Sequence, residues 1–516
     1  MTALSAVALG ASAISILCAD LRWLRVAQRE HYLPGAAVRF AWRWWVGTPV
    51  NIGLGVVALA CAGAAAIVPG VAIGAAAAVV AGPVRLGLRG RTSRLAWTRR
   101  MSQVALVTVA LQVAAIALAG AFAGLPGAVL AAVLSAIGSP LFVDAALSVL
   151  QPLENLLAQG YVRRGEAVLA RVQPIVVGIT GSYGKTTTKN YVAYLLGGDR
   201  SVVASPRSFN NRAGLSRTVN EQLTPGTDVL VAEMGAYGPG EIAALCSWLR
   251  PEVAVITSIG PAHMERFGSL DRTLEAKAEI TSNARVVVLN VDDGRLDGLA
   301  KRLDATHKVV RASGTDAGAD VAVLAHDEGL ELRVAGRPSG VAVLAPGTSA
   351  PIRTNAACAA AVALELGVPP EAVARRLASL PSVPNRLQPY RAEGGYLVLD
   401  DTFNANPAGA RHALEVLGCE APAGRRVLVT PGMVELGKSQ SAENAAFAET
   451  AARVATDVVI VGRTNRAALL AGCGREGPGP PVKLVGRREE AVVWARAQLG
   501  PGDAVLFEND LPDHFP

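Results

Sequence analysis

The feature that most constrains this fold is a glycine-rich stretch between two apolar segments, Gly178-Ile-Thr-Gly-Ser-Tyr-Gly-Lys-Thr-Thr-Thr188. The apolar run Ile175-Val-Val177 precedes it, and an amphipathic run begins after it at Asn190. This order predicts a strand, a tight loop and a helix. Glycine lets the backbone turn sharply and aim its N–H groups at one point, which the positive end of the helix also faces. The stretch therefore predicts a site for phosphate groups.

The side chains of this loop suit a nucleotide. The Lys185 ammonium can reach terminal phosphates, and the Thr186 hydroxyl suits a Mg2+ ion. The strict Walker pattern expects a glycine at position 179, where this chain has Ile179. A glycine-rich turn without a ligand therefore stays as the alternative, although the strand–loop–helix order favours a nucleotide. The predicted contacts are Gly181, Ser182, Tyr183, Gly184, Lys185, Thr186 and Thr187.

Charge divides the 516-residue chain into two parts. Residues 1–150 contain 11 arginines, no lysine and three acidic residues, whereas the whole chain has a net charge of +7. The basic character therefore belongs to the first part, and the remainder is close to neutral. Because nucleic-acid binding needs a basic surface, we expect no nucleic-acid partner for the remainder.

Residues 1–150 predict an α-helical transmembrane region of about five spans. Apolar runs occupy residues 2–19, 46–84 and 102–122, and a further run follows the turn at 124–127 and ends near Leu147. A Pro-Gly break at 69–70 divides the second run into two spans. As a helix, the run 102–122 is about 31 Å long, enough to cross the hydrocarbon core. A cleaved signal peptide is the alternative for the first run, but no basic segment precedes it.

The arginines indicate an orientation for these spans. They cluster after the first run and between the third and fourth spans, whereas the connections at 69–70 and 124–127 carry no charge. By the positive-inside rule, the arginine-rich loops lie in the cytoplasm together with residues 151–516, and the N-terminus lies outside. We therefore expect a multi-pass protein of the cytoplasmic membrane, in contact with the lipid bilayer, with its remaining domains in the cytoplasm.

Residues 151–172 predict a linker helix, after which strands alternate with helices. Apolar runs of strand length between helical segments predict parallel sheets covered on both faces. Short alternating runs at 320–345 predict a small antiparallel insert. We expect two α/β domains, a central P-loop domain at 173–385 and a C-terminal Rossmann-like domain at 386–516. The predicted strands are Ile175–Thr180, Val202–Ser205, Asp228–Met234, Val253–Gly260, Arg285–Val291, Tyr396–Asp401, Arg426–Thr430, Asp457–Gly462, Val482–Val485 and Ala504–Phe507.

Four polar residues of the central domain are candidates for a site. Parallel sheets bind ligands at the carboxyl ends of their strands, where Glu233 ends one predicted strand and His263 follows another. Glu233 suits a Mg2+ ligand or a helix-capping acid, and His263 suits a site or a solvated loop. Asn211 suits a site or a turn, and Lys277 suits a site or an exposed helix position. None of these residues is decisive alone.

Taken in order, the motifs around these residues resemble the Mur ligase family, bacterial ATP-dependent enzymes that add amino acids or dipeptides to the peptidoglycan precursor. The resemblance covers about residues 173–510 and is greatest to the members that add D-alanyl-D-alanine. The motifs are Gly181-Ser-Tyr-Gly-Lys-Thr-Thr187, Phe209-Asn-Asn211, Glu233-Met-Gly235, Gly240-Glu-Ile242, Ile259-Gly-Pro-Ala-His-Met-Glu-Arg-Phe-Gly-Ser269, Ala276-Lys-Ala-Glu-Ile280, Asp400-Asp-Thr-Phe-Asn-Ala-Asn-Pro407 and Gly432-Met-Val-Glu-Leu-Gly437. Coincidence is a poor explanation for this many matches in one order.

The resemblance implies ATP and two Mg2+ ions as cofactors and gives each residue a role. Lys185 and Thr186 would hold the phosphates and one ion, which Glu233 would also ligate. His263 would ligate the second ion. Lys277 corresponds to the carbamylated lysine of the family, whose added carboxylate helps to hold Mg2+. The implied catalytic residues are Lys185, Lys277, His263 and Asn211, and the implied metal ligands are Thr186, Glu233, His263 and Lys277.

Further contacts are implied outside the loop. Asn355, Arg386 and Asp401 would contact the nucleotide, and residues 432–437 would line the pocket for the incoming amine. Asn404 and Asn406 would lie at the cleft between the two α/β domains.

The chain departs from the family pattern at three places. Pro351 replaces a histidine, which puts the adenine contacts in question. Phe507-Glu-Asn-Asp510 replaces a Lys-Gly-Ser type loop, which puts a simple D-alanyl-D-alanine substrate in question. The predicted transmembrane region stands where the family has a domain that binds the UDP-sugar.

The implied reaction is ATP-dependent amide formation in cell-wall precursor synthesis, through an acyl-phosphate intermediate. The first hypothesis is a ligase that adds D-alanyl-D-alanine, or a similar amino acid or D-dipeptide amine, to a UDP-linked muropeptide. The alternative is the same chemistry on a lipid-linked muropeptide carboxylate at the membrane. A third hypothesis, a nucleotide-driven transporter or sensor, requires polar residues in the spans, of which Gln112 and Asp144 are the main candidates.

Overall fold

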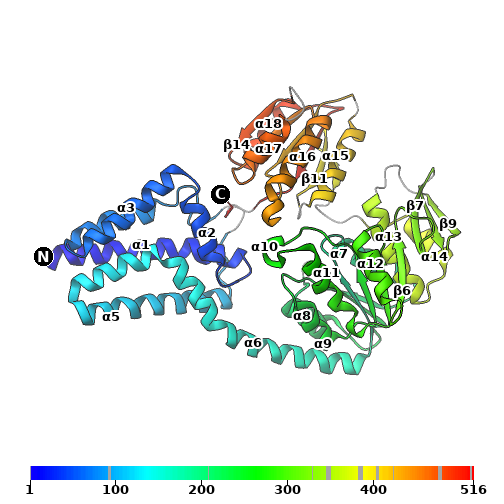
Figure 1. Ribbon diagram of the computed structural model, residues 1–516, viewed down its shortest axis with the longest axis horizontal. Coiled ribbons are helices and arrows are strands. Elements are labelled where there is room, and N and C mark those ends of the chain that lie inside the picture. The colour runs from blue at the N-terminus through cyan, green and yellow to red at the C-terminus, as the bar shows by residue number, and fades with distance from the viewer. Residues whose placement is uncertain are drawn as a thin grey trace. The chain divides into compact units, whose positions relative to one another are not determined.

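The computed structural model forms two compact units, residues 1–157 with 511–516 and residues 158–510 (Figure 1). We call them the helical unit and the α/β unit, and each is described by itself. The structure describes residues 2–90, 94–206, 209–327, 329–343, 350–381, 387–402, 406–421, 423–474, 479–511 and 514–515.

The helical unit is a bundle around its first helix. α1 packs against α4 and α5, and α3 packs against α4. The core of the bundle contains large side chains such as Trp23, Phe40 and Leu147. Its elements are α1 (Thr2–Arg29), α2 (Ala36–Trp45), α3 (Pro49–Ala65), a short 3-10 helix (Pro69–Val71), α4 (Ala72–Ala81), α5 (Arg99–Ile137) and the first part of α6 (Ser139–Val172).

The helical unit has fewer helices of spanning length than the five predicted. Among its described residues, α1, α5 and α6 have the length and hydropathy to cross a bilayer, and α2 with α3, bent by 109°, makes a fourth if the pair is one span. The apolar helix at Pro69–Ala81 is shorter than a span. By length and hydropathy the count is three or four, with α5 counted once although it contains two helices joined at Gly124.

The turn predicted at 124–127 is present, whereas the predicted linker helix is arranged differently. Gly124 has a non-helical backbone, with φ 64°, and joins two helices within α5. On one straight helix Gln112 and Ser139 would lie about 40 Å apart, yet both donate to Asp20 Oδ1, so the chain reverses between them (Figure 1). After Gly138, α6 continues as one helix to Val172. Pro152 lies inside α6, so the loss of one backbone N–H there does not end the helix. The predicted linker is the second half of a longer helix.

Several buried polar side chains inside the helical unit form hydrogen bonds with backbone or side-chain groups of other helices. The Arg22 guanidinium donates to the carbonyl oxygens of Val79 at 2.8 Å and Gly82 at 2.6 Å. The Asp144 carboxylate accepts from the N–H of Val38 at 2.9 Å, in the first turn of α2. Gln112 donates to Asp20 Oδ1 at 2.9 Å. Gln112 and Asp144, the candidates for a substrate path, thus make hydrogen bonds that join helices.

The last described residues of the chain belong to the helical unit. The Trp44 indole N–H donates to the carbonyl oxygen of His514 at 2.8 Å, and His514 Nε2 lies 3.1 Å from Glu30 Oε1. The Phe515 ring meets Phe40 edge-on with centroids 5.2 Å apart. We call residues 511–516 the tail. The predicted C-terminal domain extended to residue 516, whereas the α/β unit ends at Asp510.

The central domain contains a nine-stranded sheet with the order β2-β3-β1-β4-β5-β6-β7-β8-β9. Strands β1 to β7 pair in parallel, whereas β8 and β9 are antiparallel. One face packs on α7 (Lys185–Leu196) and α13 (Ala350–Glu365), and the other on α9 (Glu241–Leu249) and α12 (Gly294–Leu303). The strands are β1 (Ile175–Thr180), β2 (Val202–Ala204), β3 (Val229–Glu233), β4 (Val253–Ile256), β5 (Val286–Asn290), β6 (Lys308–Ser313), β7 (Val321–His326), β8 (Gly329–Val334) and β9 (Arg337–Val343).

The prediction of two α/β domains with mainly parallel sheets is confirmed, with one correction to the central sheet. The expected antiparallel insert is continuous with the main sheet, because β6 joins it through parallel pairing of Ala312 with Val321. Strand β6 was not predicted from the sequence.

The C-terminal domain contains a six-stranded sheet with the order β10-β11-β15-β12-β13-β14. Only its edge strand β10 is antiparallel. The strands are β10 (Gln388–Arg391), β11 (Leu397–Asp401), β12 (Arg426–Thr430), β13 (Asp457–Val461), β14 (Val482–Val485) and β15 (Ala504–Glu508). The covering helices are α15 (Pro407–Glu420), α16 (Gln440–Val454), α17 (Arg466–Cys473) and α18 (Arg488–Gln498).

Candidate functional site

The glycine-rich loop joins β1 to α7, as predicted, and its glycines are required by close neighbours. Gly181 has φ 149°, and a Cβ there would lie 2.0 Å from Thr257 Oγ1. Gly184 has φ 81°, and a Cβ there would lie 2.3 Å from Asn355 Oδ1. Asn355 lies on α13 and also accepts from Thr188 Oγ1 at 3.2 Å. The structure therefore brings the predicted contact Asn355 to the loop.

Lys185 and Thr186 begin α7 and point at different partners. The Lys185 ammonium donates to the carbonyl oxygens of Gly181 at 2.6 Å and Ser182 at 3.0 Å, so it folds over the loop. The Thr186 hydroxyl donates to Glu233 Oε2 at 3.0 Å. A hydroxyl and a carboxylate thus meet beside a phosphate-type loop, which is the oxygen chemistry that Mg2+ prefers.

Glu233 ends β3 and is almost completely buried. Lys189 Nζ lies 3.5 Å from its carboxylate, and Asn210 Nδ2 donates to Oε1 at 3.3 Å. Burial lowers the pKa of Lys189, whereas the adjacent Glu233 opposes that change. A buried carboxylate requires such partners, because desolvating an unpaired charge is costly. Lys189 was not predicted as a site residue, because in the sequence it is one of several polar residues of a helix.

The predicted residue Asn211 and its neighbour Asn210 have different contacts. Asn211 is the N-cap of α8 (Arg212–Gln222), where its side chain accepts from Gly214 N at 2.9 Å. Asn210 is the one that reaches Glu233. A catalytic role for Asn211 stays a prediction, and Asn210 joins the candidate site.

Lys277 lies on α11 (Leu270–Ala278) and is 3% exposed. Burial lowers its pKa well below the ordinary lysine value, and nearby Lys185 lowers it further. Its Nζ lies 5.8 Å from the centre of the Phe267 ring. These surroundings favour a neutral amine, which is the nucleophilic form of lysine.

His263 lies in a loop that follows β4 and has φ 55°. Its Nδ1 lies 2.5 Å from Oε2 of Glu435, a residue of the C-terminal domain. The Tyr237 ring meets the imidazole edge-on, with centroids 4.7 Å apart. Glu435 was predicted in the amine pocket, and its contact with His263 was not predicted.

The end of β15 explains the departure at 507–510. Glu508 is fully buried, and the Thr430 hydroxyl donates to its Oε2 at 2.7 Å. Asp510 pairs with Arg488 at 2.9 Å. Neither acid is therefore a free anion in the loop. The objection that two acids would repel a carboxylate-bearing amine loses its basis.

The other predicted contacts fall partly outside the described residues. Asp401 ends β11, and its Oδ1 accepts from Leu387 N at 3.1 Å. Asn406 is the N-cap of α15, where it accepts from Gly409 N at 2.9 Å. Arg386 and Asn404 lie outside the residues that the structure describes.

In the described part of the chain, no three His, Cys, Asp or Glu side chains meet at one point. A Mg2+ site there would instead combine Thr186 and Glu233 with phosphate oxygens, which is a usual arrangement for this ion. The residues present therefore fit a phosphate-bound Mg2+.

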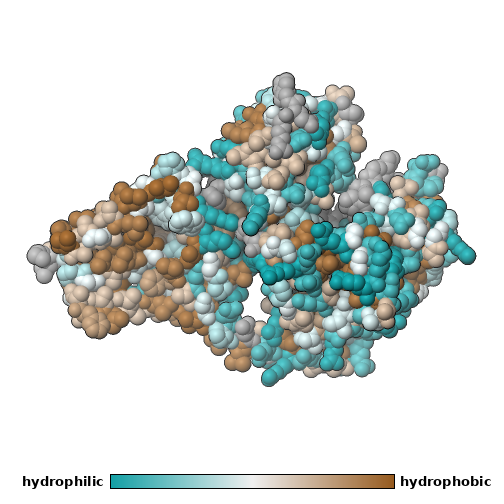
Figure 2. All heavy atoms as spheres, viewed as in Figure 1, coloured by the Kyte–Doolittle hydropathy of each residue, from teal (hydrophilic) through white to brown (hydrophobic). Residues whose placement is uncertain are grey.

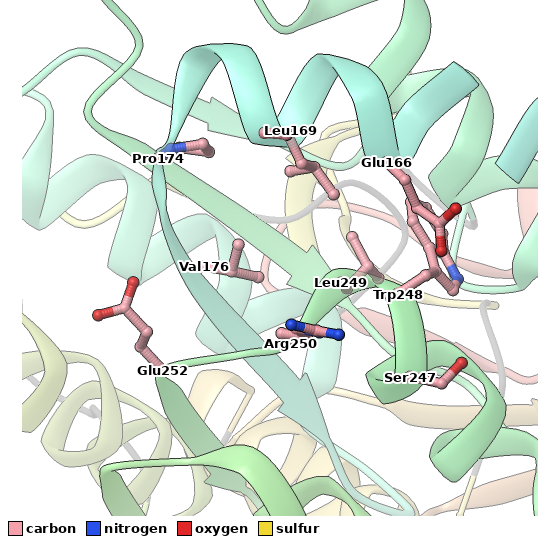
Figure 3. Close-up of a pocket in the computed structure, with 10 residues that line it drawn as sticks. Glu166, Leu169, Pro174, Val176, Ser247, Trp248, Leu249, Arg250 and Glu252 are labelled. Carbon is pink, nitrogen blue, oxygen red and sulfur yellow. The ribbon is translucent and has the colours of Figure 1, made fainter. Parts of the chain in front are cut away.

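A cavity of about 330 Å³ lies elsewhere in the α/β unit (Figure 3). Val176 and Glu252 place it at the amino-terminal ends of β1 and β4, the sheet edge opposite the glycine-rich loop. Figure 3 shows Glu166 and Leu169 of α6 projecting from one side of this cavity, with Leu249 and Arg250 on the other side. None of the predicted site residues lines it, so it is not the nucleotide site.

Comparison with known proteins covers both α/β domains. Residues 179–363 match the Mur ligase middle domain, and residues 385–508 match the Mur ligase, glutamate ligase domain. The chain is 35% identical over 370 residues to the UDP-N-acetylmuramoyl-tripeptide–D-alanyl-D-alanine ligase of Mycobacterium bovis, covering 64% of this chain and 70% of that one. The ligase of that name from Escherichia coli is 35% identical over 310 residues, covering 58% of this chain and 67% of the relative.

Solved structures of ligases from other bacteria resemble this chain as well. MurF from Acinetobacter baumannii superposes with a TM-score of 0.60 at 26% identity, covering 68% of this chain and 77% of that one. MurF ligase from Thermotoga maritima in complex with ADP superposes with a TM-score of 0.59 at 27% identity, covering 68% of this chain and 80% of that one. The loop geometry, the domain matches and these relatives lead to one conclusion: the chain belongs to the Mur ligase family of ATP-dependent carboxylate–amine ligases.

Proposed function

We propose that this chain is the ligase that joins D-alanyl-D-alanine, or a similar amine, to the free carboxylate of a UDP-muramoyl tripeptide in peptidoglycan synthesis. The observation that carries this proposal is the site at the ends of β1 and β3. A phosphate-type loop, the Thr186–Glu233 pair and the buried Lys277 occur together in a chain that is 35% identical to ligases of that name.

The first step is phosphoryl transfer from ATP. An oxygen of the acceptor carboxylate attacks the γ-phosphorus in line, the bond to the β-phosphate oxygen breaks, and an acyl phosphate and ADP result. Lys185 is placed to turn from the loop carbonyls to the phosphates, and the N–H groups of the loop hold them. Bound Mg2+ supplies neutralisation of the phosphate charge.

Lys277 fits a carbamate. The lowered pKa of this buried lysine favours the neutral amine, whose lone pair attacks carbon dioxide and whose proton leaves. The product is an anion in place of a cation that would repel Lys185. An anion there would help to balance Lys185 and Mg2+.

The second step needs an amine beside the acyl phosphate. The amine nitrogen attacks the acyl carbon, phosphate leaves, and the amide forms. The loop at 432–437 is our candidate for the amine pocket, with Asp401 and Arg386 as nucleotide contacts from the C-terminal domain. Glu508 and Asp510 are engaged by Thr430 and Arg488, so neither argues against a D-dipeptide that carries a carboxylate.

The test is a turnover assay on the full chain in detergent. ADP release and product mass are measured with the UDP-linked tripeptide and D-alanyl-D-alanine, and with other amino acids as amines. We expect ATP-dependent ligation that Lys185→Ala abolishes, because the loop then lacks its cation. Unchanged product formation in that variant would overturn the site assignment.

We further propose that the helical unit lies in the cytoplasmic membrane. Large apolar side chains are exposed on it, including Phe122 at 85% and Leu106 at 71%, and Figure 2 shows them gathered over this unit. Such surfaces are uncommon on soluble proteins. Recovery of the chain from cells in an alkaline-washed membrane fraction is expected, and its recovery in the soluble fraction would contradict this.

The apolar helical unit also favours one alternative acceptor, a lipid-linked muropeptide carboxylate at the bilayer surface. The same assay, with the lipid-linked acceptor in mixed micelles, separates the two. Turnover with the soluble UDP-linked acceptor at ordinary affinity would remove the lipid-linked alternative.

A further inference from the structure

The loop after β12, residues 431–437, is held by buried amide side chains from three directions. Asn444 on α16 exchanges two hydrogen bonds with the backbone of Met433, at 2.8 and 2.9 Å. Asn465 donates to the carbonyl oxygen of Pro431 at 3.0 Å, and Asn509 donates to that of Gly432 at 2.7 Å. The C-terminal domain therefore presents this loop as a fixed structure.

Glu435 in this loop contacts the central domain at two points. Its carbonyl oxygen accepts from Met264 N at 3.0 Å, and its carboxylate accepts from His263 Nδ1 at 2.5 Å. Both Glu435, with φ 65°, and His263, with φ 55°, adopt left-handed backbone conformations, which side-chain-bearing residues rarely do. Such conformations persist where the surroundings determine them, typically at functional sites.

The contact fixes the state of the imidazole. An ionised carboxylate accepts hydrogen bonds but donates none, so Nδ1 must carry the hydrogen. In the neutral ring, Nε2 then has a free lone pair, and the Tyr237 ring packed edge-on limits rotation of the imidazole. Histidine ligands of metals usually donate their second N–H to a carboxylate in this way.

Folding stability does not explain the pair. The His263 side chain is 26% exposed and that of Glu435 is 40% exposed. An ion pair or hydrogen bond at that exposure contributes little to folding, because water competes with it. The contact instead joins a residue of the ATP-binding domain to a residue of the other catalytic domain.

We propose that Glu435 is a positioning residue, whose carboxylate holds His263 in the Nδ1–H form and so leaves the lone pair of Nε2 available to a metal ion. Since the carboxylate comes from the C-terminal domain, His263 is oriented only when the two domains are together. This inference rests on the proposed ligase function, in which His263 ligates Mg2+.

The test combines kinetics with a spectroscopic readout. Full-length protein in detergent is loaded with Mn2+ and ADP, and electron spin echo modulation detects nitrogen of an imidazole bound to the Mn2+. The variants are Glu435→Ala, Glu435→Gln and His263→Gln. The matched control is Glu415→Ala, because Glu415 pairs with His412 at 3.4 Å on α15 of the same domain.

We expect wild type and Glu415→Ala to show the nitrogen modulation and His263→Gln to lose it. Glu435→Ala should lose most of the modulation and lower kcat about ten-fold, with KM for ATP changed less than two-fold. Glu435→Gln should retain part of the nitrogen modulation and part of kcat, because its amide oxygen can still accept the hydrogen bond from His263 Nδ1. The thermal unfolding temperature of these variants should match that of wild type.

Three results would count against the inference in distinguishable ways. Modulation and kcat in Glu435→Ala equal to those of Glu415→Ala would overturn it. Turnover by wild type without nitrogen modulation would show that His263 is no ligand, which overturns the inference and leaves the ligase function intact. Absence of turnover in wild type with every acceptor would overturn the proposed function itself.

Discussion

Replacing Glu508 with glutamine should stabilise the C-terminal domain at neutral pH. Glu508 lies at the end of β15 with 0% exposure, beside Thr430 of β12. Burial raises its pKa to about 8, Asp401 raises it slightly further, and the hydrogen bond from Thr430 acts in the opposite direction. The folded domain therefore holds this carboxyl as the neutral acid near pH 7, and glutamine resembles that acid in shape.

The direction of the pH dependence follows from the protonation of Glu508 in the folded and in the unfolded chain. The pKa of this carboxyl is the ordinary 4.5 in the unfolded chain and about 8 in the folded chain. Between these values the folded state binds more protons, so the free energy of unfolding falls as pH rises. Relative to a variant with a neutral side chain, the free energy of unfolding of wild type is lower by about 3 kcal/mol at pH 7 and by less than about 1 kcal/mol at pH 5.

Hydrogen exchange measured by mass spectrometry is the assay. Peptides covering β12 and β15 report the opening free energy of this domain. The glutamine NH2 costs about 1–3 kcal/mol at every pH if it lacks an acceptor, so the difference between pH values is diagnostic. From pH 5 to pH 7, the opening free energy of E508Q should rise by about 2 kcal/mol relative to that of wild type. For the variant Glu489→Gln, at an exposed site, this difference from wild type should not change with pH. An equal pH dependence of E508Q and wild type would refute the reasoning.

Three further results are expected. Lys277→Ala should lose ligase activity, with partial rescue by formate or acetate, and activity that is independent of carbon dioxide would contradict the carbamate. Gly184→Ala should weaken ATP binding at least ten-fold in calorimetry, because the new Cβ would meet Asn355 at 2.3 Å where φ is 81°; unchanged affinity would show that the loop relaxes. Trp44→Phe should lower the stability of the tail attachment by about 1 kcal/mol through loss of the bond to His514, measured as faster proteolysis of the tail than in Trp97→Phe.

Most of the strands that the sequence predicted are buried on both faces, although the edge strands β2 and β14 are not. β1, β4 and β12 are nearly continuous runs of Val, Ile and Leu, a pattern with few alternatives. β6 was missed because Lys308 and Arg311 interrupt its apolar residues, and its pairing with β5 depends on tertiary structure. The short edge strand β10 contains Pro389, which argues against a strand in the sequence.

The candidate site was predictable where one motif contains it. The loop residues and Glu233 follow strand ends, so sequence and topology place them together. The pairing of His263 with Glu435 joins residues from two domains, and no local pattern carries that information. Asn210 and Asn211 are adjacent and identical in type, so only the backbone conformation decides which one caps α8 and which one reaches Glu233.

The tail gives the chain an unusual connectivity. The α/β unit begins at residue 158 within α6 and ends at Asp510, and the chain on each side of it belongs to the helical unit. The catalytic domains are thus an insertion closed at both ends. Closing a loop reduces the freedom of its unfolded state, so the attachment through Trp44 and His514 should favour refolding of this insertion.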